Sequence, residues 1–310
     1  MKSTKKITLV FAIALIGVFS TSCKKELKDI SNPDSSSIQQ LVKDEVVIES
    51  SSEEAINDAN DVLSKNNTKD MQLMPCNANI DSVLIADTMI YTITFNGLNC
   101  AGTKFKTGKL IVKKNVLTPW SQALTTVTIR FDSLKVTKVS NGNWVMMNGT
   151  KTCQNVSGGL VKNLTSSSSP IVQKVIGSIQ ATFSDNTTRT WNVARQITYS
   201  GNYATHELLI SLAGLGSENG YTNLVVWGIN RHNENFYTQI SQAIVLRESC
   251  GWNAISGIKT HQIPSDNKSA TITFGFNNLN QPITGNACPE KLKIDWTKGS
   301  YSGTLFLDLP

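Results

Sequence analysis

Short segments in which apolar and polar residues alternate follow one another from about residue 80 to the end of the chain. Clear examples are 89–95 (MIYTITF), 125–139 (TTVTIRFDSLKVTKV) and 270–276 (ATITFGF). Alternation with a period of two places one face of a strand against a core and the other toward water. Turn signals separate the segments: Asn141-Gly142 fits a type I′ hairpin, and 184–187 fits another turn. The pattern predicts an all-β body of mostly antiparallel strands.

Two architectures fit so many strands. An antiparallel β-sandwich-like body, made of one or two units, is the first expectation. A single long, twisted antiparallel sheet is the alternative. The serine-rich stretch 164–170 (LTSSSSP) is the clearest internal loop, and it divides the body into β unit 75–163 and β unit 171–310. One continuous domain with a long loop fits the same stretch.

A short helix is predicted over residues 51–65, ahead of the strands. Ser51 and Glu54 form a capping box at its start. Apolar residues then recur on one side of the helix, at Ala55, Ile56, Ala59, Val62 and Leu63. The preceding segment 23–50 is polar and serine-rich, which predicts a flexible tether.

The first 22 residues have the layout of a secretory signal peptide. Lys2, Lys5 and Lys6 form a positive segment, 7–19 is an apolar run, and small residues lead into Cys23. The run is too short for a transmembrane helix, which needs about 20 apolar residues, but it fits a signal peptide. A cysteine directly after the cleavage site predicts lipidation of Cys23. The alternative is an ordinary residue that follows the cleavage site.

The polar residues Lys24, Lys25 and Glu26 follow Cys23, and Ser20 stands where lipidation motifs prefer leucine. In these features and in its β-rich body the chain resembles secreted lipoproteins of Bacteroidetes-type bacteria. The resemblance brings no known activity with it. It implies a protein of the bacterial cell envelope, anchored in the lipid bilayer of the outer membrane by acyl chains on Cys23. Whether the body faces the periplasm or the cell surface is left open.

Charge is distributed unevenly along the chain. Residues 24–70 hold six Lys and eleven Asp or Glu, whereas residues 71–310 hold twenty Lys or Arg and twelve Asp or Glu. An acidic tether therefore precedes a basic body. The basic body could attract anionic glycans or lipid phosphates, or it could present an ordinary solvated surface. Because basic runs with interleaved aromatic residues are absent from the sequence, we expect no nucleic-acid partner.

Lipidation of Cys23 would leave five cysteines in a compartment that permits disulfides. Cys76 and Cys100 lie near the start of the body, and Cys250 and Cys288 lie near its end. Each of these neighbouring pairs could close a local loop, although four cysteines allow three pairings and the sequence does not choose among them. Cys153 would then be the one cysteine of the five that is left outside these pairs.

The sequence contains no HExxH, GxSxG or CxxC motif, so we predict no catalytic residue, no metal and no cofactor. Sugar-binding surfaces use exposed aromatic rings, because a flat ring packs against the apolar face of a pyranose. The densest mixture of ring, charge and amide is 227–237 (WGINRHNENFY). Trp227, Arg231, His232 and Tyr237 of this segment form the candidate ligand loop.

Together these features favour a membrane-anchored, non-enzymatic binding or structural β-module, with a glycan or another envelope component as its partner. The alternative is a glycan-active hydrolase with an unrecognised pair of carboxylates. Glycoside hydrolysis needs two acids about 5–10 Å apart. The acidic residues of 71–310 are scattered, so the sequence does not identify such a pair.

Overall fold

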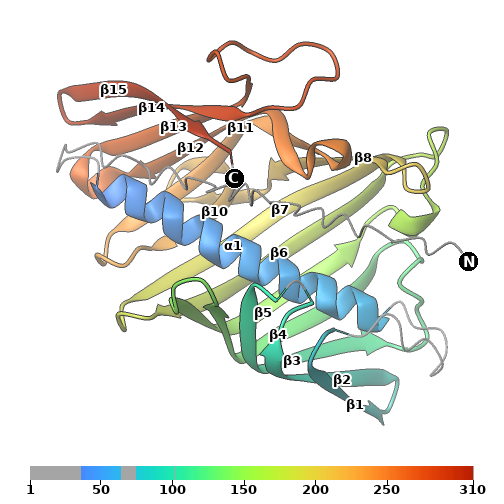
Figure 1. The fold of residues 1–310 in the computed structure, drawn as a ribbon. Helices are drawn as coiled ribbons and strands as arrows, with labels where there is room; N and C mark the ends of the chain where they lie inside the picture. The colour runs from blue at the N-terminus through green and yellow to red at the C-terminus, as the bar shows by residue number, and fades with distance from the viewer. Residues whose placement is uncertain (1–35, 64–74, 101, 310) are drawn as a thin grey trace, which may run out of the picture. The chain divides into compact units, whose positions relative to one another are not determined.

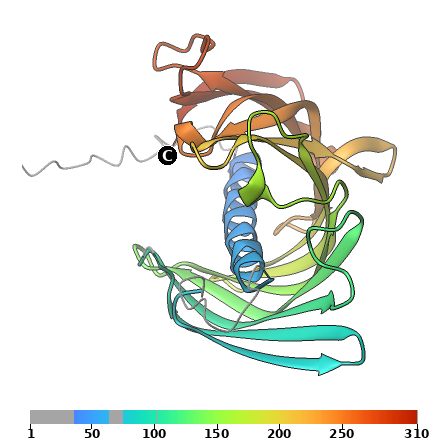
Figure 2. The ribbon, with the colours of Figure 1, turned by 90° about the vertical axis from the view of Figure 1, so that its right-hand side faces the viewer.

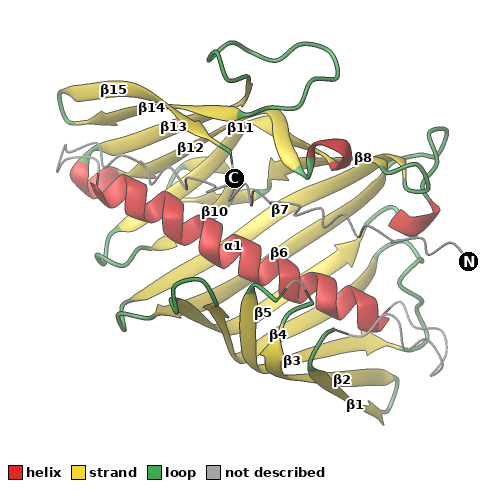
Figure 3. Cartoon of the chain, in the orientation of Figure 1, coloured by secondary structure: helices red, strands yellow, loops and turns green. Residues whose placement is uncertain are grey.

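The computed structural model describes residues 36–63, 75–100 and 102–309 (Figure 1). These residues are mostly strand, with one α-helix, α1 (Ser36–Leu63), and short 3₁₀ turns (Figure 3). The expectation of an all-β, antiparallel body with a helix near its N-terminal side is confirmed. The signal peptide predicted over 1–22, Cys23 and the first part of the predicted tether lie outside the described residues. No described helix combines the length and the apolarity that crossing a membrane requires.

Fifteen strands follow α1 in the described part of the chain. The first seven are β1 (Ala78–Ile85), β2 (Thr88–Leu98), β3 (Lys104–Asn115), β4 (Thr125–Lys138), β5 (Trp144–Asn155), β6 (Ile171–Phe183) and β7 (Thr188–Asn202). The other eight are β8 (Glu207–Gly214), β9 (Gly216–Glu218), β10 (Tyr221–Ile229), β11 (Asn235–Arg247), β12 (Asn253–Ile263), β13 (Lys268–Phe276), β14 (Lys291–Lys298) and β15 (Tyr301–Asp308).

Backbone hydrogen bonds join these strands almost entirely in sequence order. Each strand from β1 to β7 pairs antiparallel with the next, and so does each strand from β10 to β15. Between β7 and β11 two short strands share one position in the sheet. There β10 pairs with 190–193 of β7, β8 pairs with 195–202, and both strands pair with β11 on their other side. Strand β9 pairs with β10.

Helix α1 begins at Ser36, so the expected flexible tether is already helical over residues 36–50. The helix predicted over 51–65 is the second half of α1, and its predicted apolar side is buried as expected. In the first half Ile48 is fully buried, Asp44 is buried in an ion pair with Arg231 of the turn between β10 and β11, and Glu45 is buried in an ion pair with Lys259 of β12. Tertiary contacts of this kind stabilise a helix beyond what local propensity predicts.

The sheet curves around α1 (Figure 2). The helix contacts β3 and β4 toward one end of the strand order and β13 toward the other. A register shift between Thr107 and Lys109 marks a bulge in the pairing of β3 with β4. Gly108 at this bulge has a φ of +96°, and a Cβ there would lie 2.2 Å from the backbone oxygen of Ser133. Glycine is therefore required where the sheet bends.

The serine-rich stretch 164–170 lies in the connection between β5 and β6. These two strands pair directly with each other, from Val145 opposite Phe183 to Asn155 opposite Gln173. The predicted boundary between 75–163 and 171–310 therefore falls between two neighbouring, hydrogen-bonded strands.

Two disulfides join the cysteines that are neighbours in sequence. Cys76 pairs with Cys100, which links the start of β1 to the loop after β2. Cys250 pairs with Cys288, which links the turn after β11 to the loop before β14. Cys153 lies buried in β5, outside both disulfides.

Candidate functional site: an acidic helix on a basic sheet face

Helix α1 presents a row of carboxylates to basic side chains of the sheet. The acids are Asp44, Glu45, Glu49, Glu54 and Asp58. Their basic partners are Lys104, Lys106, Arg189, Arg195, Arg231, Lys259 and His261. Part of the acidic segment and part of the basic body thus neutralise each other inside the fold.

Glu45 lies at the centre of the most buried of these contacts. Its Oε2 accepts a hydrogen bond from the hydroxyl of Thr238 at 3.2 Å and lies 3.3 Å from Nδ1 of His261. Lys259 Nζ lies 3.5 Å from Oε1, and Arg189 Nη2 lies 3.7 Å from Oε2. Strands β7, β11 and β12 therefore converge on one carboxylate of α1.

The environment keeps Glu45 ionised and His261 neutral at physiological pH. Burial opposes ionisation of Glu45, but the nearby His261, Lys259 and Arg189 and the hydrogen bond from Thr238 hold its pKa at about 2. Burial lowers the pKa of His261 to about 4, although Glu45 acts in the opposite direction. Above pH 4 the imidazole is neutral, so Lys259 and Arg189 supply the positive charge that stabilises the carboxylate.

Arg231 connects α1 to two hairpin turns. Its Nε and Nη2 donate to the two carboxylate oxygens of Asp44 at 2.8 and 2.9 Å, a bidentate pair. Its Nη1 donates to Asp185 at 2.7 Å and to Thr187 at 3.0 Å, both at the turn between β6 and β7. One side chain thus fixes the first half of α1 against both turns.

Several of the basic side chains also lie over aromatic rings of the sheet. The cation-to-centroid distance is 4.2 Å for Arg189 over Phe236 and 4.2 Å for Arg231 over Phe183. It is 4.6 Å for Lys151 over Trp191, and Lys151 also hydrogen-bonds Ser52 of α1. An aromatic face attracts a desolvated cation. The rings and the helix therefore stabilise the same cations from different sides.

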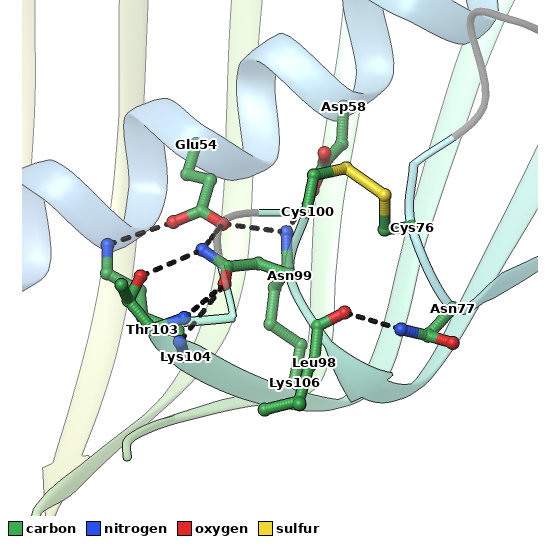
Figure 4. The surroundings of a disulfide bond; sticks show 10 residues. All are labelled: Glu54, Asp58, Cys76, Asn77, Leu98, Asn99, Cys100, Thr103, Lys104 and Lys106. Carbon is green, nitrogen blue, oxygen red and sulfur yellow. Dashed lines mark hydrogen bonds and ion pairs between the residues drawn. A yellow bond between two sulfur atoms is a disulfide. The ribbon is translucent and has the colours of Figure 1, made fainter. Parts of the chain in front are cut away.

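A second cluster lies near the end of α1, beside the Cys76–Cys100 disulfide (Figure 4). Glu54 accepts hydrogen bonds from Lys104 at 2.9 Å and from Asn99 at 3.1 Å. Lys106 contacts both acids, with Nζ 3.1 Å from Glu54 and 2.6 Å from Asp58. Asn99 directly precedes Cys100, so the disulfide holds the loop that carries this contact.

The two acids of this cluster have pKa values shifted in opposite directions. Burial opposes ionisation of Glu54, but the hydrogen bond from Lys104 and the charge of Lys106 outweigh it and lower the pKa. Burial raises the pKa of Asp58, against the hydrogen bond and charge of Lys106. Such a divergence is also found where two carboxylates serve as acid and base.

The structure brings together two of the four residues of the candidate ligand loop, Trp227 and Tyr237, and places Arg231 and His232 in different surroundings. Arg231 is occupied with Asp44, as described above, and His232 is exposed in the turn between β10 and β11. Trp227 and Tyr237 are direct partners across β10 and β11. Tyr237 is buried and stacks on Tyr221, with ring centroids 4.3 Å apart.

Sequence reasoning identified the opposite charges of the two segments but not their contact. The signal that could have revealed it is the spacing of Glu45, Glu49, Glu54 and Asp58, which return to one side of a helix every four or five residues. The histidines lie in different surroundings: His206 is exposed and 2.9 Å from Glu248, whereas His261 is buried beside Glu45.

Comparison with known proteins found no matching family model, no matching curated protein and no matching solved structure.

Replacing Glu45 with glutamine should destabilise the protein by about 3 kcal/mol or more. The substitution keeps the size of the side chain but removes the buried carboxylate that lies beside Arg189 and Lys259, and breaking a buried ion pair typically costs about 3–5 kcal/mol. Urea unfolding measures the change. Glu218→Gln, at an exposed position, is the matched control and should leave stability within about 0.5 kcal/mol. Equal stability of the two variants would contradict the role given to Glu45.

Acid should destabilise the fold in two steps. His261 has a pKa of about 4 in the fold and 6.5 as a model value, so the unfolded chain binds its proton more strongly and stability falls as pH drops from 6.5 to 4. Glu45 adds a loss between pH 4.5 and 2. The first step should cost roughly 3 kcal/mol.

Unfolding free energies at pH 7 and pH 4.5 test the first step. His261→Gln should reduce the difference between the two pH values, because the variant lacks the titrating group. His232→Gln, in the exposed turn, should retain the full difference. A difference that is identical in wild type and His261→Gln would show that His261 does not cause the acid sensitivity.

Proposed function

We propose that the protein is a lipid-anchored lipoprotein of the bacterial cell envelope that acts as a non-enzymatic binding or structural β-module. The anchor would be Cys23, with its acyl chains in the outer membrane. The observation that carries the proposal is the integration of α1 into the body through buried ion pairs. Residues 36–63, in the acidic segment that follows the cysteine, therefore belong to the core of the body.

The body of this module is best described as one twisted and curved antiparallel sheet, the alternative to a sandwich. The unbroken hydrogen-bonded order of strands supports this description. So does the position of α1, whose buried side chains belong to the same apolar cluster as those of the strands. In a sandwich, a second sheet would occupy the position that α1 takes here.

The charge pairing also changes what the basic body implies about partners. Of its cations, Arg189, Arg195 and Lys151 are buried against α1. Arg189 and Arg195 pair with acids of the helix and Lys151 with a serine hydroxyl, so these three cations do not present a surface to anionic glycans. An uncharged envelope component fits the remaining surface better than an anionic partner does.

Replacement of Cys23 with serine should abolish lipidation and release the protein from the membrane. The full-length chain is expressed in a Bacteroidetes host and labelled with palmitate that carries a click-chemistry tag. Wild type should carry the label and sediment with membranes, whereas Cys23→Ser should be unlabelled and at least ten-fold depleted from that fraction.

Cys153→Ser is the matched control, because it removes another cysteine outside the disulfides and should leave labelling unchanged. If Cys23→Ser kept the label and the membrane fraction, the proposed anchor would be wrong.

A glycan-active hydrolase is the second candidate, and one observation favours it. Glu54 and Asp58 share Lys106, and their pKa values shift in opposite directions. The raised pKa of Asp58 suits a general acid, and the lowered pKa of Glu54 suits a nucleophile or base. We rank this function second because the shared lysine and the contacts with Asn99 and Lys104 fit a structural ion cluster that fastens α1.

Hydrolysis of neutral oligosaccharides by the purified chain tests this candidate. If Asp58 is the acid, Asp58→Asn should lower the rate at least a hundred-fold, whereas Asp81→Asn, at an exposed position of β1, should not. Product formation no greater than with heat-treated protein, or a rate that Asp58→Asn leaves unchanged, would eliminate the candidate.

A further inference from the structure

A cavity of about 340 Å³ lies along β12 and β13, and Tyr221, Thr260, Gln262 and Ser269 are among the residues that line it. We propose that this cavity binds an uncharged carbohydrate of one to three sugar units. The inference deepens the proposed binding function and rests on it.

The cavity opens on the face of the sheet that is turned away from α1. Successive side chains of a strand point to opposite faces. On β12, His261 faces the helix through Glu45, so its neighbours Thr260 and Gln262 point away from the helix. On β11, Thr238 contacts Glu45, so Tyr237 and Gln239 point away as well. A ligand could therefore enter without displacing α1.

Aromatic rings form one side of this face. Tyr221 stacks on Tyr237 with an interplanar angle of 15°, and the hydroxyl of Tyr237 accepts a hydrogen bond from Asn219 at 2.6 Å. These contacts fix the orientation of Tyr221, which is partly exposed and lines the cavity. Trp227 lies opposite Tyr237 on the same face but is not among the residues that line the cavity. Tyr221 is thus the aromatic ring that the cavity offers to a ligand.

The other walls carry hydroxyls and amides already arranged in pairs. Gln262 donates to Gln239 at 3.1 Å, and the hydroxyls of Ser269 and Thr297 lie 2.8 Å apart. Each hydroxyl has two lone pairs and one proton, so these groups keep capacity for a ligand. Lys268 also borders the cavity, but it directly precedes Ser269 on β13, so its side chain points to the buried face of the sheet, and it forms an ion pair with Asp266. The cavity therefore offers hydrogen bonds without a net charge.

This combination fits a sugar better than it fits an ion or an apolar molecule. A pyranose presents hydroxyls at its edge and C–H groups on its face, which match the amide and hydroxyl walls and the ring of Tyr221. The volume lies at the lower end of the range of small-molecule pockets, which limits the ligand to a few sugar units. The neutralised lysine disfavours an acidic sugar.

Saturation-transfer NMR with the full mature chain in detergent tests the proposal. The probes are cellotriose, maltotriose, chitotriose and a sulfated trisaccharide, each titrated to about 10 mM, the range in which weak sugar binding is measured. At least one neutral probe should bind, and the sulfated probe should bind more weakly. Tyr221→Ala and Gln262→Ala should each weaken binding of the neutral probe at least ten-fold.

Tyr203→Ala is the control, because Tyr203 is an exposed tyrosine in the loop after β7. It should bind as the wild type does. A thermal melt of each variant establishes that it is folded. If Tyr221→Ala does not fold, binding by Gln262→Ala decides the result. Absence of binding by all neutral probes, preference for the sulfated probe, or binding unchanged by Gln262→Ala would overturn the proposal. These outcomes are independent of the Cys23 labelling experiment, which uses no sugar.

Discussion

The buried ion pairs of Glu45 hold together parts of the chain that are far apart in sequence. One carboxylate of α1 meets Arg189 of β7, Thr238 of β11 and both Lys259 and His261 of β12. A buried charge is tolerated only when it is paired and hydrogen-bonded. The buried carboxylate of Glu45 must therefore be paired. The position of α1 and the curvature of the sheet bring its partners from β7, β11 and β12 to it. Asp44, the sequence neighbour of Glu45, and Glu54, in the second half of the helix, form further ion pairs with basic side chains of the body.

This dependence explains the uneven charge of the chain. The acidic segment could serve as a solvated spacer, but the structure places several of its acids inside the body. Buried ion pairs add little net stability compared with apolar packing, but a pair that loses one partner leaves a buried charge uncompensated, which is strongly destabilising. The pairs thus define where α1 lies along the sheet. A body with α1 fixed in this way leaves the outer face of the sheet, where Tyr221 and Gln262 lie, available for a ligand.

The sequence predicted the strands, the antiparallel pairing and the second half of the helix, because alternation and helical periodicity are local signals. It also predicted the local cysteine pairs as one of three possibilities. The start of α1 at Ser36 was missed because contacts such as Glu45 with Arg189 join residues that are distant in sequence. The candidate ligand loop grouped residues whose side chains lie on opposite faces of the sheet. Arg231 contacts α1, whereas Tyr237 lies on the outer face, and the sequence does not show this because it depends on strand register.

Native-state hydrogen exchange of the full chain tests most directly whether α1 is part of the core. If it is, amide protons of α1 between Glu45 and Ala59 should exchange with the same free energy of opening as those of β5 and β7, because the helix can be released only when the sheet unfolds. The same experiment on Glu45→Gln should lower the protection of both elements together. Exchange of the α1 amides at an opening free energy several kcal/mol below that of the strands would contradict the account and identify α1 as a separate, detachable segment.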